Sequence, residues 1–175
     1  MNGGRIRRPL YQGRALTLNE ERVVFPDGRR EWQEIVRHPG GAGALALDDD
    51  DRVCMIRQYR HAVDDWLWEI PAGRLEPGEE PLACAQRELG EEGGVRATDW
   101  RVLARLLPSP GICDERIYLF LARDLHPVAT AHEASEYIEI HWLSFDQALA
   151  KACAGGIVDA KTVIALQQAR LCAGV

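Results

Sequence analysis

Three glutamates, Glu88, Glu91 and Glu92, stand just before a Gly-Gly pair in the stretch GRLEPGEEPLACAQRELGEEGGV, residues 73–95. In a helix the spacings i, i+3 and i+4 place them on one face, where like charges repel by about a few tenths of a kcal/mol per pair. They also meet the negative end of the helix dipole, which costs roughly 0.3–1 kcal/mol each at exposed sites. Arg87 is the one basic residue of the helical stretch.

Two interpretations follow from these residues alone. The glutamates form a solvated acidic face, or they bind a hard divalent cation, which takes carboxylate oxygens and converts the repulsion into coordination. Mg²⁺ usually keeps several waters and completes its shell with phosphate oxygens of a substrate. The preceding loop PAGRLEPGE contains glycines that let the backbone approach a metal or a phosphate closely. The residues by themselves leave both interpretations open.

A helix over residues 81–92 must carry these carboxylates. Pro81 suits its first turn, and the pair Gly93-Gly94 suits its end. Its apolar residues share a face away from the glutamates and are expected in the core: Leu82, Ala85 and Leu89.

Most other segments read as strands. Apolar or alternating runs of strand length occupy residues 41–48, 52–60, 64–70, 100–108, 116–125 and 136–144. Two further helices are expected over residues 145–156 and 159–174, the second opening at Asp159 as N-cap. Strands with helices between and after them predict an α+β fold or a mixed α/β/α sandwich.

The first forty residues alternate short apolar runs with turns, and Pro26-Asp27-Gly28 is a hairpin signal. These strands contain too little apolar mass to hold a core alone, so they must pair with the main body or with a second subunit. We therefore expect an N-terminal antiparallel β extension over residues 1–40 and a main domain over residues 41–175.

Composition narrows the function classes. The chain has 175 residues, 46% of them hydrophobic and 27% charged, with a formal net charge of −6. That charge argues against nucleic acid as a partner. No run approaches the roughly 18 apolar residues needed to cross a membrane, and the basic N-terminus lacks the apolar core of a signal peptide. A cytoplasmic protein without a membrane partner is expected.

Residues 73–95 resemble the signature of the Nudix hydrolase family: G, five residues, E, seven residues, then R-E-U-x-E-E-x-G-U, where U is aliphatic. Every specified position is matched, by Gly73, Glu79, Arg87, Glu88, Leu89, Glu91, Glu92, Gly94 and Val95. The resemblance implies a loop–helix–loop metal site in a mixed α/β/α sandwich.

The resemblance also implies roles within the motif. Glu88 and Glu92 would be the main ligands of Mg²⁺, or of Mn²⁺ or another divalent cation. Glu91 would ligate or orient the water, and the Ala72 carbonyl would add a backbone oxygen. The structural positions of the motif are Gly73, Glu79, Arg87 and Gly94.

Further segments resemble the ADP-ribose pyrophosphatase subgroup. Pro110 lies sixteen residues after Gly94 and is followed by a glycine and an acid. With VRHPGGAGALAL, IRQYR, LWEIPAGRLEPGE and the leader, the similarity covers about residues 11–145. In that subgroup the leader is exchanged between two subunits, which implies a homodimer with composite sites.

The subgroup suggests substrate contacts, each with an alternative. Arg57 and Arg60 are phosphate clamps or face solvent. Trp32 stacks on adenine or packs in the core or at a dimer interface, and Arg37 reaches the ligand or lies on a surface strand. Glu69 joins the metal or substrate network or forms a strand-end salt bridge, and Glu115 contacts substrate or metal or forms a loop salt bridge.

A general base outside the motif is expected in the acidic loop before a late strand. Glu133 and Glu136 stand there, and Glu136 is favoured because it aligns better with the acid that precedes an aromatic-I-E-aliphatic run. Ala134-Ser135 between them departs from the usual doubly acidic pattern, so the choice stays open.

The predicted function is Mg²⁺-dependent hydrolysis of ADP-ribose to AMP and ribose 5-phosphate. The alternative is a pyrophosphatase of another nucleoside diphosphate sugar such as GDP-mannose. A non-catalytic nucleotide-binding module of the same fold is a remote alternative, because the motif retains all its glutamates.

Overall fold

The computed structural model describes residues 6–132 and 136–175. Its contacts divide the chain into two units. One contains the residues up to Gly40 together with Leu107–Arg116, and the other contains Gly41–Leu106 and Ile117–Val175. None of the described helices is long and apolar enough to cross a membrane.

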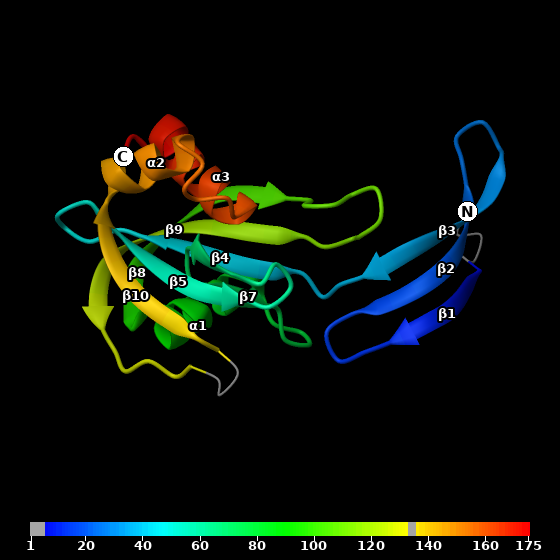
Figure 1. Ribbon diagram of the computed structural model, residues 1–175, viewed down its shortest axis with the longest axis horizontal. Helices are drawn as coiled ribbons and strands as arrows, with labels where there is room; N and C mark the ends of the chain where they lie inside the picture. The colour runs from blue at the N-terminus through cyan, green and yellow to red at the C-terminus, as the bar shows by residue number, and fades with distance from the viewer. Residues whose placement is uncertain (1–5, 133–135) are drawn as a thin grey trace. The chain divides into compact units, whose positions relative to one another are not determined.

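The first unit is an antiparallel sheet in the order β1-β2-β3 (Figure 1). Its strands are β1 (Arg7–Gln12), β2 (Thr17–Val24) and β3 (Arg30–Arg37). The Pro-Asp-Gly signal does join β2 to β3, with Gly28 at a φ of 85°. The loop Leu107–Arg116 belongs to the same unit and is bound to β3, because the Val36 N–H donates to the Ile112 carbonyl over 2.8 Å. The expectation of a β extension ending at residue 40 did not include this loop.

The second unit holds two sheets. An antiparallel sheet has the order β10-β5-β6, and a mixed sheet has the order β7-β4-β9-β8, in which β4 and β9 run parallel. The strands are β4 (Gly41–Ala46), β5 (Arg52–Arg60), β6 (Asp65–Glu69), β7 (Ala72–Arg74), β8 (Val95–Leu106), β9 (Ile117–Pro127) and β10 (Ile138–Ser144).

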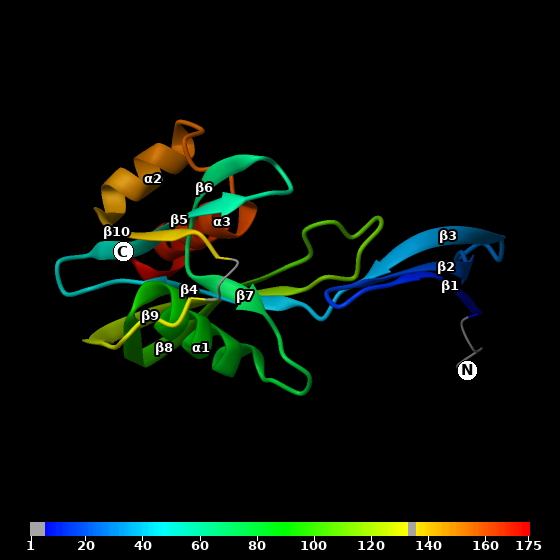
Figure 2. The same ribbon diagram turned by 60° about the horizontal axis from the view of Figure 1, so that its bottom comes forward.

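Helices cover the mixed sheet of this unit on both faces (Figure 2). They are α1 (Pro81–Gly93), α2 (Phe145–Cys153), α3 (Ala160–Gln168) and a short π-helix, η1 (Ala169–Ala173). Helix α1 lies on one face and α3 lies on the other, and α2 packs against α3 and against the strands β10 and β5. The α/β/α layering expected from the sequence is confirmed, with strands dominating.

Strand β4 shows why both faces are covered. Successive side chains of a strand point to opposite faces. Leu45 and Leu47 join the cluster that contains Phe145 of α2 and Leu166 of α3, whereas Ala44 joins the cluster beside α1. Because every residue of β4 is buried, this strand anchors both helical layers and places β7 and α1 beside each other.

Candidate active site

Helix α1 is bounded as its local signals predict. It begins at Pro81, where a missing N–H costs nothing, and its C-cap Gly94 adopts a left-handed φ of 67°. The Gly94 N–H donates to the Gly90 carbonyl over 3.2 Å. Leu82 is an exception to the expected core face, because it is 38% exposed.

Glu92 is buried against the strand that precedes the motif loop. Only 2% of the residue is exposed, and its Oε2 accepts the backbone N–H of Ala72 over 2.8 Å. Burial raises the pKa of Glu92 to about 8, and the charges of Glu88 and Glu136 act in the same direction. The Ala72 hydrogen bond and the charge on Arg60 oppose this shift. A buried carboxylate with such a pKa is a group that a cation stabilises in its charged form.

Glu88 fills the space beside Gly73. A Cβ built on Gly73 would stand 1.9 Å from Glu88 Oε1, so glycine at this position makes room for the carboxylate. Burial raises the pKa of Glu88, while Arg87 lowers it and the charges of Glu91 and Glu136 raise it. The interpretation of a solvated acidic face does not fit, because Glu88 and Glu92 are both buried.

Arg87 holds the acidic groups of the motif in place. Its guanidinium donates to both oxygens of Glu79, over 3.0 and 3.1 Å, to Glu88 Oε1 over 2.6 Å and to Glu91 Oε2 over 3.0 Å. It also donates to the Arg74 carbonyl over 3.1 Å. Because the guanidinium stays charged, it offsets part of the repulsion that the glutamates create.

Arg60 and Glu69 form a bidentate ion pair in this unit. The guanidinium Nε and Nη2 donate to the two oxygens of Glu69 over 2.7 and 2.8 Å, and Lys161 also binds that carboxylate. Of the two interpretations of Glu69, the structure contains the strand-end salt bridge. The charge of Arg60 acts on Glu92. Arg57 is exposed, with its guanidinium 5.8 Å from the Trp66 ring centroid.

The segment that leads to the expected base is attached to the end of α1. The Val128 N–H donates to the Gly94 carbonyl over 2.9 Å, and the Ala131 N–H donates to the Glu91 carbonyl over 3.0 Å. Glu136 is half-buried, and its charge raises the pKa of both buried motif glutamates. Glu133 lies outside the described residues.

The other substrate-contact candidates belong to the first unit. Arg37 is bound on two sides, donating to Glu21 over 2.8 and 2.5 Å and to Asp114 over 2.8 Å. Trp32 is 37% exposed, with the Arg8 guanidinium 4.0 Å from its ring centroid. Glu115 lies 3.3 Å from His38 Nδ1.

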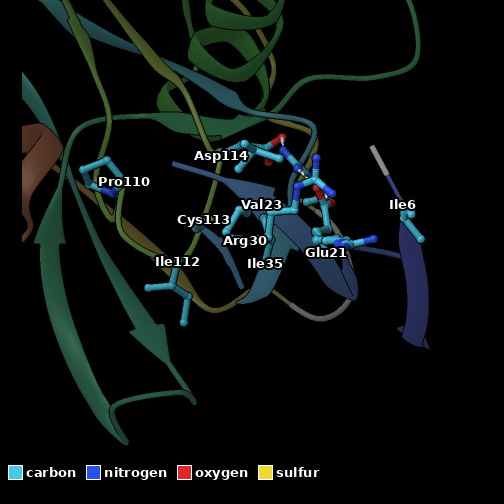
Figure 3. Close-up of a pocket in the computed structure, with 12 residues that line it drawn as sticks. Ile6, Glu21, Val23, Arg30, Ile35, Pro110, Ile112, Cys113 and Asp114 are labelled. Atoms are coloured by element: carbon cyan, nitrogen blue, oxygen red, sulfur yellow. Dashed lines mark hydrogen bonds and ion pairs between the residues drawn. The ribbon is translucent and has the colours of Figure 1, made fainter. Parts of the chain in front are cut away.

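A pocket of about 640 Å³ lies within the first unit, and Trp32 and Glu115 are not among the residues that line it. Glu21 and Asp114 lie together in it, whereas Pro110 and Ile112 lie away from them (Figure 3). Arg37 also lines the pocket. Arg22 and Arg30 line it too, and apolar walls with a few charged groups are typical of pockets that bind small ligands.

The donors of the second unit fit a hard divalent cation. They are carboxylate oxygens, which Mg²⁺ prefers, and they stand in a cradle that a Cβ at position 73 would fill. The buried Oε1 of Gln58 has no hydrogen-bond partner among the described residues and lies on the same face of β5 as Arg60. Across the residues the structure describes, no three His, Cys, Asp or Glu side chains are arranged as a metal site, and Arg87 is hydrogen-bonded to Glu88 and Glu91.

Three residues of this region were not predicted from the sequence. Gln58 follows Arg57, an expected phosphate-binding residue. Its burial depends on which face of β5 it occupies and on which elements cover that face, and the sequence alone gives neither. Lys161 and Thr162 stand 92 residues from the groups that they bind, Glu69 and Ile70. No local pattern carries that information.

Comparison with known proteins identifies the family. A family model of the NUDIX domain matches residues 37–164, so the chain belongs to the Nudix family. It is 37% identical over 164 residues to a methanol dehydrogenase activator of Bacillus methanolicus, with 93% of this chain and 89% of that protein covered. It is 35% identical, over the same length and shares, to an ADP-ribose pyrophosphatase of Bacillus subtilis (strain 168).

A solved structure supports the same fold. The crystal structure of an ADP compounds hydrolase is similar with a TM-score of 0.80 and 23% sequence identity, covering 94% of this chain and 90% of that one. The family resemblance drawn from residues 73–95 and the mixed sandwich are therefore both confirmed.

Proposed function

We propose that this protein is a divalent-metal-dependent ADP-ribose pyrophosphatase that releases AMP and ribose 5-phosphate. The family membership and the ADP-ribose pyrophosphatase of Bacillus subtilis among its relatives support the reaction. The observation that carries the proposal is the pair Glu88 and Glu92, two carboxylates buried side by side with raised pKa values. Such a pair is costly in a metal-free structural helix and useful in a metal site.

The proposed site holds Mg²⁺ through Glu88, Glu91, Glu92 and the Ala72 carbonyl. When bound, the ion neutralises charge on the pyrophosphate and lowers the pKa of a coordinated water. Mg²⁺ is the ion we propose because carboxylate oxygens suit it, and Mn²⁺ takes the same ligands.

The chain's own residues supply the remaining steps. Glu136 accepts the proton of the attacking water, whose oxygen bonds to one phosphorus while the bridging P–O bond breaks and the second phosphate leaves. Arg60 and Arg57 hold phosphate oxygens. Arg60 is pre-positioned by Glu69, so little side-chain entropy is lost when it binds.

The first unit supports the homodimer with composite sites. Several large apolar side chains of this thin sheet and its loop are more than half exposed: Ile6, Leu10, Tyr11, Val24 and Ile112. Exposed apolar groups at this density favour a protein partner, and a second copy of the chain is the occupant we propose. Trp32, Arg37, Pro110 and Glu115 would then complete the site that binds the nucleoside.

Turnover with Mg²⁺ tests the activity, comparing ADP-ribose, GDP-mannose, UDP-glucose and NADH by release of the monophosphate. ADP-ribose is expected to have the highest kcat/KM. A preference for GDP-mannose or UDP-glucose would replace the substrate while keeping the reaction, and no turnover of any of the four would refute the proposed enzyme.

A further inference from the structure

Thr162 of α3 is hydrogen-bonded to the segment that leads into the motif. The residue is fully buried, and its Oγ1 accepts the backbone N–H of Ile70 over 2.9 Å. The same hydroxyl donates to Asp159 Oδ2 over 2.5 Å, which also accepts the Thr162 N–H over 3.1 Å. The hydroxyl therefore has a fixed orientation, with its acceptor side toward Ile70.

Ile70 depends on that hydroxyl for its backbone hydrogen bond. It is fully buried and stands between the end of β6 at Glu69 and the start of β7 at Ala72. A buried N–H without an acceptor is costly. The hydroxyl of α3 thus replaces a strand partner at the point where the chain turns into the motif.

Lys161 binds the same segment one residue earlier. Its side chain is 11% exposed, and its Nζ binds the carboxylate of Glu69 and lies 3.0 Å from Asp159 Oδ1. Glu69 in turn holds Arg60. The first turn of α3 therefore binds both the side chain of Glu69 and the backbone of Ile70.

Each residue from 69 to 72 has a hydrogen bond or an ion pair to another element, and the partners of Pro71 and Ala72 lie outside α3. The Pro71 carbonyl accepts the Ala44 N–H over 3.0 Å, and the Ala72 N–H donates to Glu92. These contacts fix the backbone as far as the Cα of Ala72, because the Pro71 carbonyl and the Ala72 N–H share one peptide plane. The Ala72 carbonyl lies in the next plane, with the N–H of Gly73, a residue that pairs with Ala42 of β4. Contacts behind a metal ligand orient it and tune its affinity.

We propose that Thr162 and Lys161 are positioning residues for the divalent-metal site, acting through Ile70 and Glu69 on the Ala72 carbonyl and Glu92. This inference rests on the metal site of the proposed function. It assigns to the C-terminal helix a role in metal affinity, although α3 carries no expected ligand.

Metal binding by the whole protein tests this proposal. Mg²⁺ alone is titrated into wild type, Thr162→Val, Thr162→Ser and Val163→Ala, with calorimetry and the thermal unfolding midpoint as readouts. Thr162→Val is expected to raise the Mg²⁺ concentration for half-saturation by about 10-fold or more. Thr162→Ser keeps the hydroxyl and should bind like wild type. Val163→Ala removes methyl groups from the same helix, so it controls for loss of stability.

The outcomes separate the two proposals. Half-saturation of Thr162→Val equal to wild type, or raised equally in Val163→Ala, would overturn the positioning role and leave the metal site intact. No response of wild type to Mg²⁺ would overturn both. If Thr162→Val does not fold, Lys161→Met is judged by the same comparison, because it removes the ammonium group from Glu69 without emptying the core.

Discussion

The carboxylate of Glu88 occupies the space that a Cβ at Gly73 would need, with only 1.9 Å between that Cβ and Oε1. The clash involves the far end of a side chain, so an alanine here displaces Glu88 and leaves the strand intact. A substitution at Gly73 should therefore disturb the site without disturbing the fold.

Gly73→Ala is therefore expected to fold and to lose activity. The displaced carboxylate no longer reaches the cation, and the loss of about 3 kcal/mol of transition-state stabilisation corresponds to about 100-fold in kcat/KM. Gly90→Ala is the matched control, since its Cβ would meet no described atom closer than 4.0 Å and Ala stabilises a helix interior by about 0.5–1 kcal/mol. Steady-state kinetics and thermal unfolding of both variants check this, and an active Gly73→Ala enzyme would contradict it.

Glu92→Gln should remove the response to Mg²⁺ without unfolding the protein. Burial already raises the pKa of Glu92 to about 8, so a neutral amide costs little in the metal-free state, and its oxygen can still accept the Ala72 N–H. Wild type is expected to gain thermal stability at saturating Mg²⁺, whereas the variant gains none and loses about 100-fold or more in kcat. An equal thermal shift in both proteins would remove Glu92 from the metal site.

Local signals sufficed where structure depends on neighbours in sequence. Pro81 and Gly94 mark the ends of α1, and Asp159 caps α3 through the Thr162 N–H. The family motif indicated the family and the fold, because its spacing is typical of one loop–helix–loop geometry, and the metal ligands that it implies stay a prediction.

Contacts between residues that are far apart in the sequence could not be predicted in the same way. The helical wheel placed the glutamates on a face of their own but carried no information about what covers that face, so the burial of Glu88 and Glu92 followed only from the position of β7. The ties from α3 to Glu69 and Ile70 span 92 residues. Such contacts are decided by how the layers pack, which periodicity does not encode.

Glu136→Gln tests the expected base. Its carboxylate lies near enough to raise the pKa of both buried glutamates, and removing a general base typically costs about 10²–10⁴-fold in rate. The loss should appear in kcat with little change in KM, because the water and not the substrate loses its partner. Glu133→Gln is the comparison, and a larger loss in that variant would transfer the role to Glu133.

The ion pairs of Glu69 should make the unfolding free energy depend on pH in the acid range. Burial raises its pKa, but Arg60 and Lys161 outweigh burial and hold the pKa below its ordinary value of 4.5. A carboxyl group with a lowered pKa in the folded state contributes stability above pH 4.5 that is lost as pH falls through the folded-state pKa. Glu69→Gln should cost about 1–3 kcal/mol at pH 7, because it removes charged hydrogen bonds from Arg60. The cost is limited because the Arg60 side chain is 39% exposed and Lys161 keeps Asp159 as a partner.

The pH dependence is the sharper readout of that variant. Below pH 4.5 the difference in unfolding free energy between wild type and Glu69→Gln should shrink steadily, since the wild-type carboxyl becomes protonated. Denaturant unfolding from pH 3 to pH 7 checks it, with Glu31→Gln as an exposed control that should follow wild type. If the difference in unfolding free energy stayed constant across this range, the ion pair would not be the cause of the loss of stability in acid.

Subunit mixing tests the composite site. Trp32→Ala removes an expected nucleoside contact in the leader, and Glu92→Gln removes an expected metal ligand in the other unit, so each variant alone should be nearly inactive. If the leader of one subunit completes the site of its partner, random mixing gives half heterodimers with one intact site each, which restores about a quarter of wild-type activity. Sedimentation at micromolar concentration should give twice the chain mass of 19.6 kDa. A monomer, or a mixture that regains no activity after subunit exchange, would confine each site to a single chain.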